Sequence, residues 1–334
     1  MEKNQIFSKT IIEKIRSAQE AKIIQPVRIG QTEKRNELVF FIKPELLAVE
    51  NDEKILNSLD LIREKFAAFD VEVNGSAIVP GNILDAFEIM SSHYGYINQL
   101  SRKASEMING DTRQQMFEKL DLEKNPSDYK ILGGHEFLEV YDADIHTLSD
   151  IWFGRGASKL RSGFYFVEGH YQGDPIILVN GFHPSQLLHF TREDHRIFLM
   201  LLHTDSDWYD LKFDLVGDTF PEKANPDSIR GKLFADPQAY GQEQVSINTN
   251  GVHLSAGPFE AAFEVVNFFG KLLSLDPEKS PPLAIKRAIE SGMAREQALS
   301  LLENPRLNES DLFSETENLN THSAIKLALK KLGT

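Results

Sequence analysis

His253 lies in the segment NTNGVHLSAGP (248–258), between a strand-like run and an apolar helical run. Small residues and Ser255 follow it directly. A neutral imidazole is a good nucleophile near pH 7, and a phosphoryl group bound to it is labile enough to be passed on. The segment therefore indicates a nucleophilic histidine. The alternative is an ordinary histidine in a turn, solvated or hydrogen-bonded locally.

Two cations occur in segments that could serve such a histidine. Lys43 follows the apolar run LVFFI, and Arg230 lies in the loop NPDSIRG (225–231). Phosphoryl transfer depends on alignment and on positive charge around the phosphoryl oxygens. Arginine also offers a planar fork that matches phosphate. The alternatives are a solvated lysine at a strand end and an arginine that belongs to a turn.

Two further polar segments each allow a functional and a structural interpretation. The segment 133–150 could bind a metal through its histidines and carboxylates, but it lacks zinc-type spacing, so we expect a solvated acidic loop and no metal site. The candidate ligands are His135, Glu136, Glu139, Asp142, Asp144 and His146. The segment GRGASKLRSG (154–163) could approach phosphates through its backbone N–H groups, or could be a flexible connector.

The composition excludes several classes of protein. The chain has 334 residues, of which 41% are hydrophobic, and a net charge of −14, which argues against a broad duplex-binding surface. It has no cysteine, which excludes disulfides, thiolate zinc sites and cysteine nucleophiles. The N-terminal MEKNQIFSKT is charged where a signal peptide is apolar, and the apolar stretch IFLMLL (197–202) is too short to cross a bilayer. We therefore expect a soluble, cytoplasmic protein without nucleic-acid or membrane partners.

Apolar periodicity predicts the elements that must position these residues. Helices are expected over 5–18, 51–69 (capped by Asp52), 81–97 and 258–273. Strands are expected over 38–45, 71–81, 162–182 and 245–253. Residues 98–158 are polar and irregular in pattern, and short helices are expected beyond residue 276.

This order of elements predicts an α+β fold, a ferredoxin-like sandwich in which helices cover an antiparallel sheet. On the last core helix, four apolar residues share one face, which we expect to pack against the sheet, with Glu264 turned toward His253. These residues are Phe259, Phe263, Val266 and Phe269.

Five segments, in order along the chain, resemble the nucleoside diphosphate kinase family. They are IKPE (42–45), HY (93–94), GDPIILVNG (173–181), GDTFPEKANPDSIRG (217–231) and NGVHLSAGPFEAAFE (250–264). The spacings also match those of the family: eleven positions from Thr219 to Arg230, three from Asn250 to His253, and eleven from His253 to Glu264.

The resemblance implies a role for each matched residue. His253 would become a phosphohistidine, Glu264 would hold its imidazole through the far nitrogen, and Ser255 would bond near that pair. Lys43 would assist catalysis and bind phosphate. The remaining nucleotide-binding residues would be Tyr94, Phe164, Thr219, Arg230 and Asn250.

Several positions depart from the family pattern. Ala256 replaces an aspartate and Leu254 a glycine, and Phe220 replaces an asparagine. Gly163 stands where a base-stacking phenylalanine is expected, so Phe164 is proposed instead. A second phosphate-binding arginine is replaced by Phe213, for which the candidate substitutes are Lys212, Arg192 and Arg196.

The resemblance also implies a domain organisation and a function. Residues 1–36 would be an N-terminal arm, 37–275 the kinase-like domain with insertions near 98–158 and 190–212, and 276–334 a helical C-terminal extension. The chain would move the γ-phosphoryl group of a nucleoside triphosphate to a nucleoside diphosphate, with Mg²⁺ bound with the nucleotide, as a homo-oligomer that is at least a dimer. The alternatives are a catalytically impaired nucleotide-binding or interaction protein on the same fold, and a phosphohistidine relay to a protein partner.

Overall fold

The computed structural model describes residues 6–121, 126–161, 163–307 and 310–332. The chain divides into two compact units, each described by itself. Unit 1 combines residues 1–89 with residues 190–334, and unit 2 comprises residues 90–189. Both mix helices with strands, so the α+β class is confirmed. No helix within the described ranges is long and apolar enough to span a bilayer.

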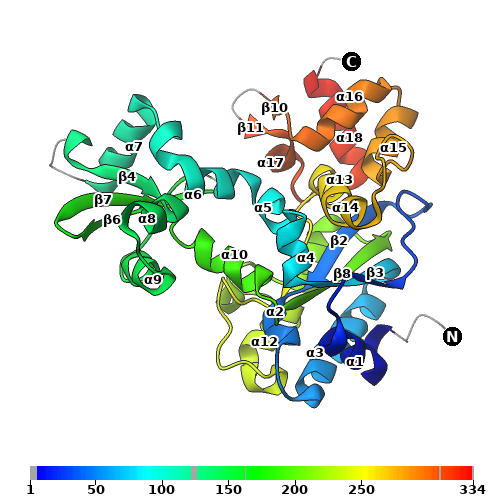
Figure 1. Cartoon of the computed structure of the whole chain (residues 1–334). Coiled ribbons are helices and arrows are strands. Elements are labelled where there is room, and N and C mark those ends of the chain that lie inside the picture. Colours follow the sequence, from blue (N-terminus) through cyan, green and yellow to red (C-terminus); the bar gives the residue numbers. More distant parts are fainter. Residues whose placement is uncertain (1–5, 122–125, 162, 308–309, 333–334) are drawn as a thin grey trace. The chain divides into compact units, whose positions relative to one another are not determined.

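Unit 1 is built on a five-stranded antiparallel sheet in the order β1-β3-β8-β2-β9. Strands β3, β8 and β2 are labelled in Figure 1. The strands are β1 (Lys22–Gln25), β2 (Asn36–Ile42), β3 (Glu72–Pro80), β8 (Arg196–Thr204) and β9 (Val252–Leu254). Every residue of β2 is buried, which requires cover on both faces of the sheet. The register shift in β3 between Val73 and Ser76 agrees with the glycine between them, at position 75.

Helices cover both faces of this sheet. One face carries α1 (Lys9–Ser17), α3 (Asp52–Ala68) and α12 (Ile229–Ala235), whose apolar residues share one core with β2, β3 and β8. The other face is contacted by α13 (Pro258–Val265) and α15 (Leu283–Glu290). The remaining helices of unit 1 are α2 (Pro44–Leu47), α4 (Gly81–Ala86), α11 (Trp208–Asp210), α14 (Lys271–Leu273), α16 (Arg295–Ser300), α17 (Leu312–Thr316) and α18 (Thr321–Leu332), beside a small hairpin of β10 (Arg306–Leu307) and β11 (Ser310–Asp311).

Unit 2 has its own sheet, in the order β4-β7-β6-β5, in which β4 and β7 are parallel. Its strands are β4 (Lys130–Gly133), β5 (Ser158–Arg161), β6 (Phe164–Tyr171) and β7 (Asp174–Val179). Its helices are α6 (Gly95–Met107), α7 (Gly110–Leu120), α8 (Gly134–Tyr141) and α9 (Ile145–Phe153), with most of α5 (Ile89–His93) and of α10 (His183–Thr191). Two apolar clusters fill this unit, one containing Phe164 and the other Trp152.

Two expectations about the order of the core need correction. The strands expected over 162–182 lie in unit 2, whereas β8, at the centre of the unit 1 sheet, falls in the region expected to be an insertion near 190–212. The described part of residues 98–158, expected to be irregular, contains most of α6, all of α7, α8 and α9, and β4. Both strand-like segments are apolar runs, and which one pairs with β2 depends on long-range contacts that periodicity does not encode.

The helices and strands expected from the sequence agree with the structure more closely than their order does, with three differences. The helix expected over 81–97 is broken into α4, α5 and α6, with Glu88 in the left-handed region (φ 49°) between the first two. Asn51, not Asp52, caps α3, because its side chain accepts from the Glu53 N–H. The strand expected over 245–253 is reduced to β9.

The two terminal regions both belong to unit 1. Helix α1 shares the main core, and β1 pairs with β3. Helices α15, α16 and α18 form an apolar cluster with Phe259 and Ala262 of α13. Of the four residues expected to face the sheet, Phe259 lies in this cluster, and the half-buried Phe263 packs on Phe313 at 5.9 Å between ring centroids. Phe268 contacts the sheet, because its ring centroid lies 5.5 Å from that of Phe41 in β2.

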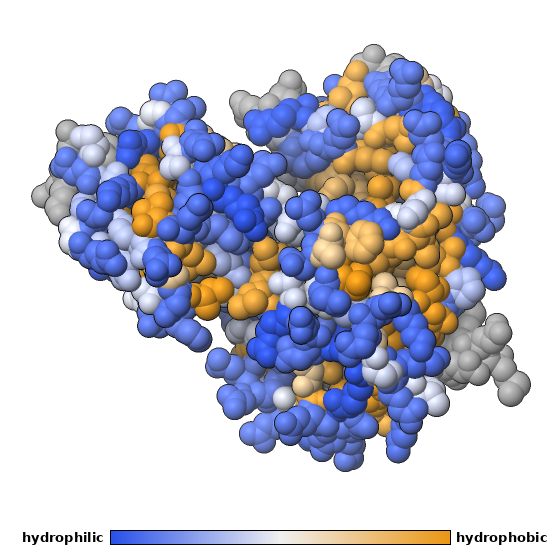
Figure 2. Space-filling view, in the orientation of Figure 1, coloured by the Kyte–Doolittle hydropathy of each residue, from blue (hydrophilic) through white to orange (hydrophobic). Residues whose placement is uncertain are grey.

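Hydrophilic residues cover most of the visible surface of each unit, with separate hydrophobic patches between them (Figure 2). Among the described residues, the large apolar side chains that are most exposed include Tyr209, Phe153 and Val140. This distribution agrees with the acidic composition.

Candidate functional site

His253 sits at the middle of the short edge strand β9, where the backbone pairing places it opposite Phe41 of β2. The imidazole stacks on the Phe41 ring, with the centroids 4.5 Å apart and the planes inclined by 16°. Only 18% of the His253 side chain is exposed. Strand pairing and ring stacking together fix the direction of the imidazole.

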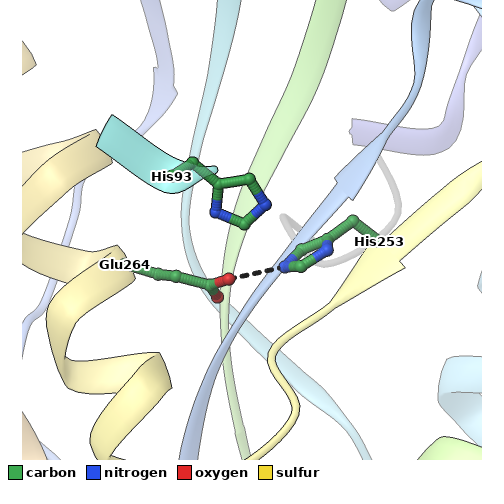
Figure 3. Close-up of side chains that lie close together, drawn as sticks. All are labelled: His93, His253 and Glu264. Atoms are coloured by element: carbon green, nitrogen blue, oxygen red, sulfur yellow. Dashed lines mark hydrogen bonds and ion pairs between the residues drawn. The ribbon is translucent and has the colours of Figure 1, made fainter. Parts of the chain in front are cut away.

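Glu264 reaches from α13 to the His253 ring, and its Oε1 atom lies 2.8 Å from Nε2 of the imidazole (Figure 3). The other carboxylate oxygen, Oε2, accepts from the Ser255 hydroxyl at 2.5 Å. Glu264 is fully buried. The contact that the sequence predicted between Glu264 and His253 is confirmed, and it involves the nitrogen far from the main chain.

Lys43 forms hydrogen bonds to the turn before β9 through both its side chain and its backbone. Its Nζ atom donates to Oδ1 of Asn250 at 2.6 Å, and its backbone N–H donates to the Gly251 carbonyl at 2.9 Å. Glu45 accepts from the Gly251 N–H at 2.9 Å. Gly251 has φ +80°, and a Cβ there would lie 2.5 Å from Leu233, so the turn requires glycine. The segments IKPE and NGVH thus meet although about 200 residues separate them.

Arg230 is buried and donates to two backbone carbonyls. Its Nη1 atom donates to Gly217 at 3.0 Å, and its Nη2 atom donates to Val252 at 2.9 Å. Thr219 joins the site through its carbonyl, which accepts from Nδ2 of Asn250 at 3.3 Å. Arg230 therefore ties the loop after Gly217 to β9, one residue from His253.

The electrostatics of the site favour a neutral imidazole. Burial, followed by the charges of Lys43 and Arg230, holds the pKa of His253 well below its usual 6.5. Burial lowers the pKa of Lys43 from 10.5 to about 8, against the attraction of Glu45. At pH 7 the structure thus holds an uncharged imidazole beside a lysine that is still cationic.

The candidate substitutes for a second phosphate-binding arginine have partners of their own. Lys212 pairs with Glu317, and Arg192 pairs with Asp194 at 2.6 Å. Arg196 donates to the Ala18 carbonyl at 2.8 Å. None of these contacts places a cation at the His253 ring.

Tyr94 and Phe164 belong to unit 2, which is described by itself. Tyr94 packs against His93, with ring centroids 4.6 Å apart. Phe164 is 1% exposed and packs against Phe166 in the core of unit 2. This burial commits the Phe164 ring to packing rather than to a ligand.

The acidic segment 133–150 uses its side chains locally. Glu136 accepts from the Gly133 N–H at 2.7 Å, Asp144 caps α9 through Thr147, and His135 contacts the Ser101 hydroxyl at 2.9 Å. No three of its candidate ligands, all within the described ranges, come together as a metal-binding group. These contacts favour a structural role for the segment.

Phe41, Glu45 and Trp208 contact the site and were not identified from the sequence. Trp208 is fully buried, and its indole Nε1 donates to the Ser255 carbonyl at 3.0 Å. The position of Glu45 within IKPE was the one signal that could have identified it. Phe41 and Trp208 have no motif of their own, since strand pairing and long-range packing bring them to the site.

Comparison with known protein-family models and with curated proteins finds no match to this chain. The resemblance to nucleoside diphosphate kinases therefore depends on the matched residues and their spacing alone.

Proposed function

We propose that the chain is a nucleoside diphosphate kinase-like phosphotransferase that works through a phosphohistidine at His253. The observation that carries the proposal is the 2.8 Å contact between Nε2 of His253 and Oε1 of Glu264. A buried carboxylate at Nε2 favours the tautomer that carries its proton there, which leaves the nucleophilic lone pair on Nδ1. Histidine then has the correct form for attack on phosphorus.

The proposed reaction has two half-reactions. Nδ1 forms a bond to the γ-phosphorus while the bond to the bridging oxygen breaks, and the diphosphate leaves with that electron pair. The positive charge on the imidazole is offset by the Glu264 carboxylate that accepts its Nε2 proton. In the second half-reaction a terminal oxygen of an acceptor diphosphate attacks the same phosphorus, and the P–N bond breaks.

Lys43, Asn250 and Thr219 would bind the nucleotide phosphates and ribose. Lys43 is the best supported, because it is cationic at neutral pH and its charge acts on the His253 ring. Mg²⁺ enters the proposal as part of the nucleotide substrate, where it offsets phosphate charge. Positive charge around the phosphoryl oxygens is the main catalytic contribution that this reaction requires.

We further propose that β2, β3, β8 and β9 form the core of a ferredoxin-like sandwich. The support is the antiparallel order β3-β8-β2-β9, with α3 between β2 and β3 and α12 between β8 and β9 along the chain. A homo-oligomer of at least two copies and a cytoplasmic location are parts of the same proposal, and they depend on the family resemblance.

A second candidate is a nucleotide-binding protein that has lost turnover. The observation that favours it is Arg230, whose Nη1 and Nη2 atoms are directed at backbone carbonyls. A guanidinium used in this way contributes charge to the site but does not offer both prongs of its fork to a phosphate. Such a protein would bind nucleotide without becoming labelled.

The two candidates are separated by incubating the protein with Mg²⁺ and ATP labelled in its γ-phosphoryl group, and then with an unlabelled nucleoside diphosphate. We expect acid-labile label on the protein, and its transfer to the diphosphate. His253→Gln should abolish labelling, while the exposed His170→Gln, with 49% of its side chain accessible, should not. Label that stays on His253 without transfer would indicate a relay. Nucleotide binding without label would indicate the second candidate.

A further inference from the structure

The turn that follows β9, residues 255–257, is held by groups far away in the sequence. The Ser255 carbonyl accepts from the indole Nε1 of Trp208 at 3.0 Å. The Ala256 carbonyl accepts from the Asn318 N–H at 2.9 Å. At Gly257 an added Cβ would lie 2.6 Å from the Thr316 carbonyl oxygen. The C-terminal segment can therefore approach the turn only because residue 257 is glycine.

Trp208 is itself fixed by a buried amide network. Its backbone N–H donates to Oδ1 of Asn320 at 3.0 Å, and the same oxygen accepts from Nδ2 of Asn36 at 2.9 Å. Oδ1 of Asn36 accepts from the N–H of Thr321, also at 3.0 Å. Asn36 and Trp208 are both 0% exposed. The network joins the start of β2, the start of α11 and the start of α18, so it holds the indole in one place.

Ser255 connects this network to the candidate site. Its hydroxyl donates to Oε2 of Glu264 at 2.5 Å and accepts from the Val39 N–H at 2.9 Å. Oε1 of Glu264 contacts Nε2 of His253. One residue thus receives the indole hydrogen bond on its carbonyl and supports the Glu264 carboxylate with its side chain.

We propose that Trp208 is a positioning residue for the reaction. Its indole N–H fixes the Ser255 peptide, and Ser255 in turn fixes the Glu264 carboxylate against His253. The inference depends on the proposed function, because it assigns Trp208 a part in phosphoryl transfer at His253. The C-terminal segment 316–321 belongs to the same hydrogen-bond network. Asn318 binds the turn at Ala256, and Asn320 binds the backbone N–H of Trp208.

Ala256 explains why this chain needs support from outside its own motif. A methyl side chain forms no hydrogen bond that could brace the turn. Its carbonyl is bound by Asn318, and its N–H donates to Glu260 at 3.2 Å. The bracing of the turn therefore comes from the helix that follows and from the C-terminal segment.

The test uses Trp208→Phe, which removes the indole N–H and keeps an aromatic ring, with Trp152→Phe as a matched control. Trp152 is the other of the chain's two tryptophans and is buried in unit 2. The first measurement is the rate of labelling by γ-labelled ATP at saturating and at low ATP. We expect Trp208→Phe to lower the saturated rate about 10- to 100-fold with an unchanged half-saturating ATP concentration, and Trp152→Phe to change neither.

The second measurement does not depend on activity. In protein with ¹⁵N-labelled histidine, the Nε2–H proton of His253 is identified as the downfield signal that His253→Gln removes. Trp208→Phe should shift this signal and speed its exchange with water, whereas Trp152→Phe should leave it unchanged. If Trp208→Phe does not fold, Asn320→Ala, which removes the acceptor of the Trp208 N–H, should have the same effects.

Each result decides a separate point. An unchanged Nε2–H signal, or an unchanged saturated rate, in a folded Trp208→Phe protein would overturn the positioning role. A rise in the half-saturating ATP concentration alone would also overturn it, because it would assign Trp208 to nucleotide binding. Unmodified protein that takes no label refutes the proposed function, and Trp208 then has no reaction to serve, although the signal still reports whether it positions the ring.

Discussion

Nζ of Lys43 lies 2.6 Å from Oδ1 of Asn250, and the two residues sit on segments that are adjacent in space. Through this contact the buried ammonium group is held near β9, where its charge lowers the pKa of His253. A cation and a neutral nucleophile side by side are what attack on a phosphate requires.

Labelling of His253 should depend on the charge of Lys43. Because the pKa of Lys43 is about 8, its charge is present at pH 7 and is lost as the pH rises through 8. We expect the labelling rate to fall above pH 8, and Lys43→Met to lower it at pH 7 about 100-fold. Lys279→Met, in which the replaced side chain is 84% exposed, is the control. A rate that stays constant to pH 9 would assign the phosphate contact to another group.

The same lysine should make the fold more stable in alkali. Its folded pKa of about 8 lies below its ordinary 10.5, so between these values the unfolded chain holds a proton that the folded chain has released. The free energy of unfolding should then rise with pH across this window, by an amount on the order of a few kcal/mol. Denaturant titrations should show a larger rise in the unmodified protein than in Lys43→Met.

Glu264→Gln should separate orientation from stability. The amide keeps a group of the same size between Ser255 and His253, so folding should survive, but it does not offset the charge on the ring. We expect labelling to fall about 100-fold or more. Glu264→Ala should also lower the free energy of unfolding by about 1–3 kcal/mol, because it removes an acceptor from the buried Ser255 hydroxyl and from the half-buried His253 ring. Exposed Glu296→Gln is the control, and a Glu264→Gln protein with normal labelling would contradict the assigned role.

Glu260 predicts a pH effect of the opposite sign. Burial, followed by the charge of Glu264, raises the pKa of Glu260 from 4.5 to about 8, while Lys212 acts the other way and Glu317 adds to the shift. The folded chain therefore retains a proton that the unfolded chain loses above pH 4.5, and stability is lost as the pH rises toward 8.

Glu260→Gln mimics the protonated acid and should remove this loss. We expect its free energy of unfolding at pH 8 to exceed that of the unmodified protein by about 1 kcal/mol or more, with little difference at pH 5. Thermal or denaturant unfolding at both pH values measures the effect, with exposed Glu20→Gln as the control. Equal stabilisation at pH 5 and pH 8 would show that Glu260 does not titrate as described.

Parts of the site that lie within one continuous segment could be predicted from the sequence. The separation of His253 and Glu264 spans a single turn and about two turns of helix, so local geometry brings them together. Lys43 and Asn250 could be paired only through the family resemblance, because the pairing of β2 with β9 is long-range.

The expected strand order was wrong because apolar periodicity cannot decide which of two apolar segments pairs with β2. Residues 174–179 and 196–204 both form buried strands, but only the latter pairs with β2. Residues 196–204 form the central strand because they pair with β2 on one side and with β3 on the other along almost the full length of β8. Phe164, which was proposed because Gly163 stands at the expected phenylalanine position, lies in the core of unit 2.

Arg230 is the residue for which the structure most changes the expected effect of a mutation. From the sequence alone it is a loop arginine whose removal would affect phosphate binding. In the structure it is buried, and it donates to the carbonyls of Gly217 and Val252. Its removal would leave two buried acceptors without their donor, and an unsatisfied buried group costs about 1–3 kcal/mol.

Arg230→Ala should therefore lower the free energy of unfolding by about 2–4 kcal/mol, beyond any effect on nucleotide affinity. Arg230→Lys should recover part of that loss, because an ammonium group can reach one carbonyl but not both. Denaturant unfolding measures stability, and equilibrium binding of ATP well below the unfolding midpoint measures affinity. Arg63→Ala, which removes a surface arginine paired with Asp60 at 2.8 Å, should change both by little. If Arg230→Ala retains full stability and loses ATP affinity, the guanidinium binds phosphate directly, and its two carbonyl contacts are dispensable.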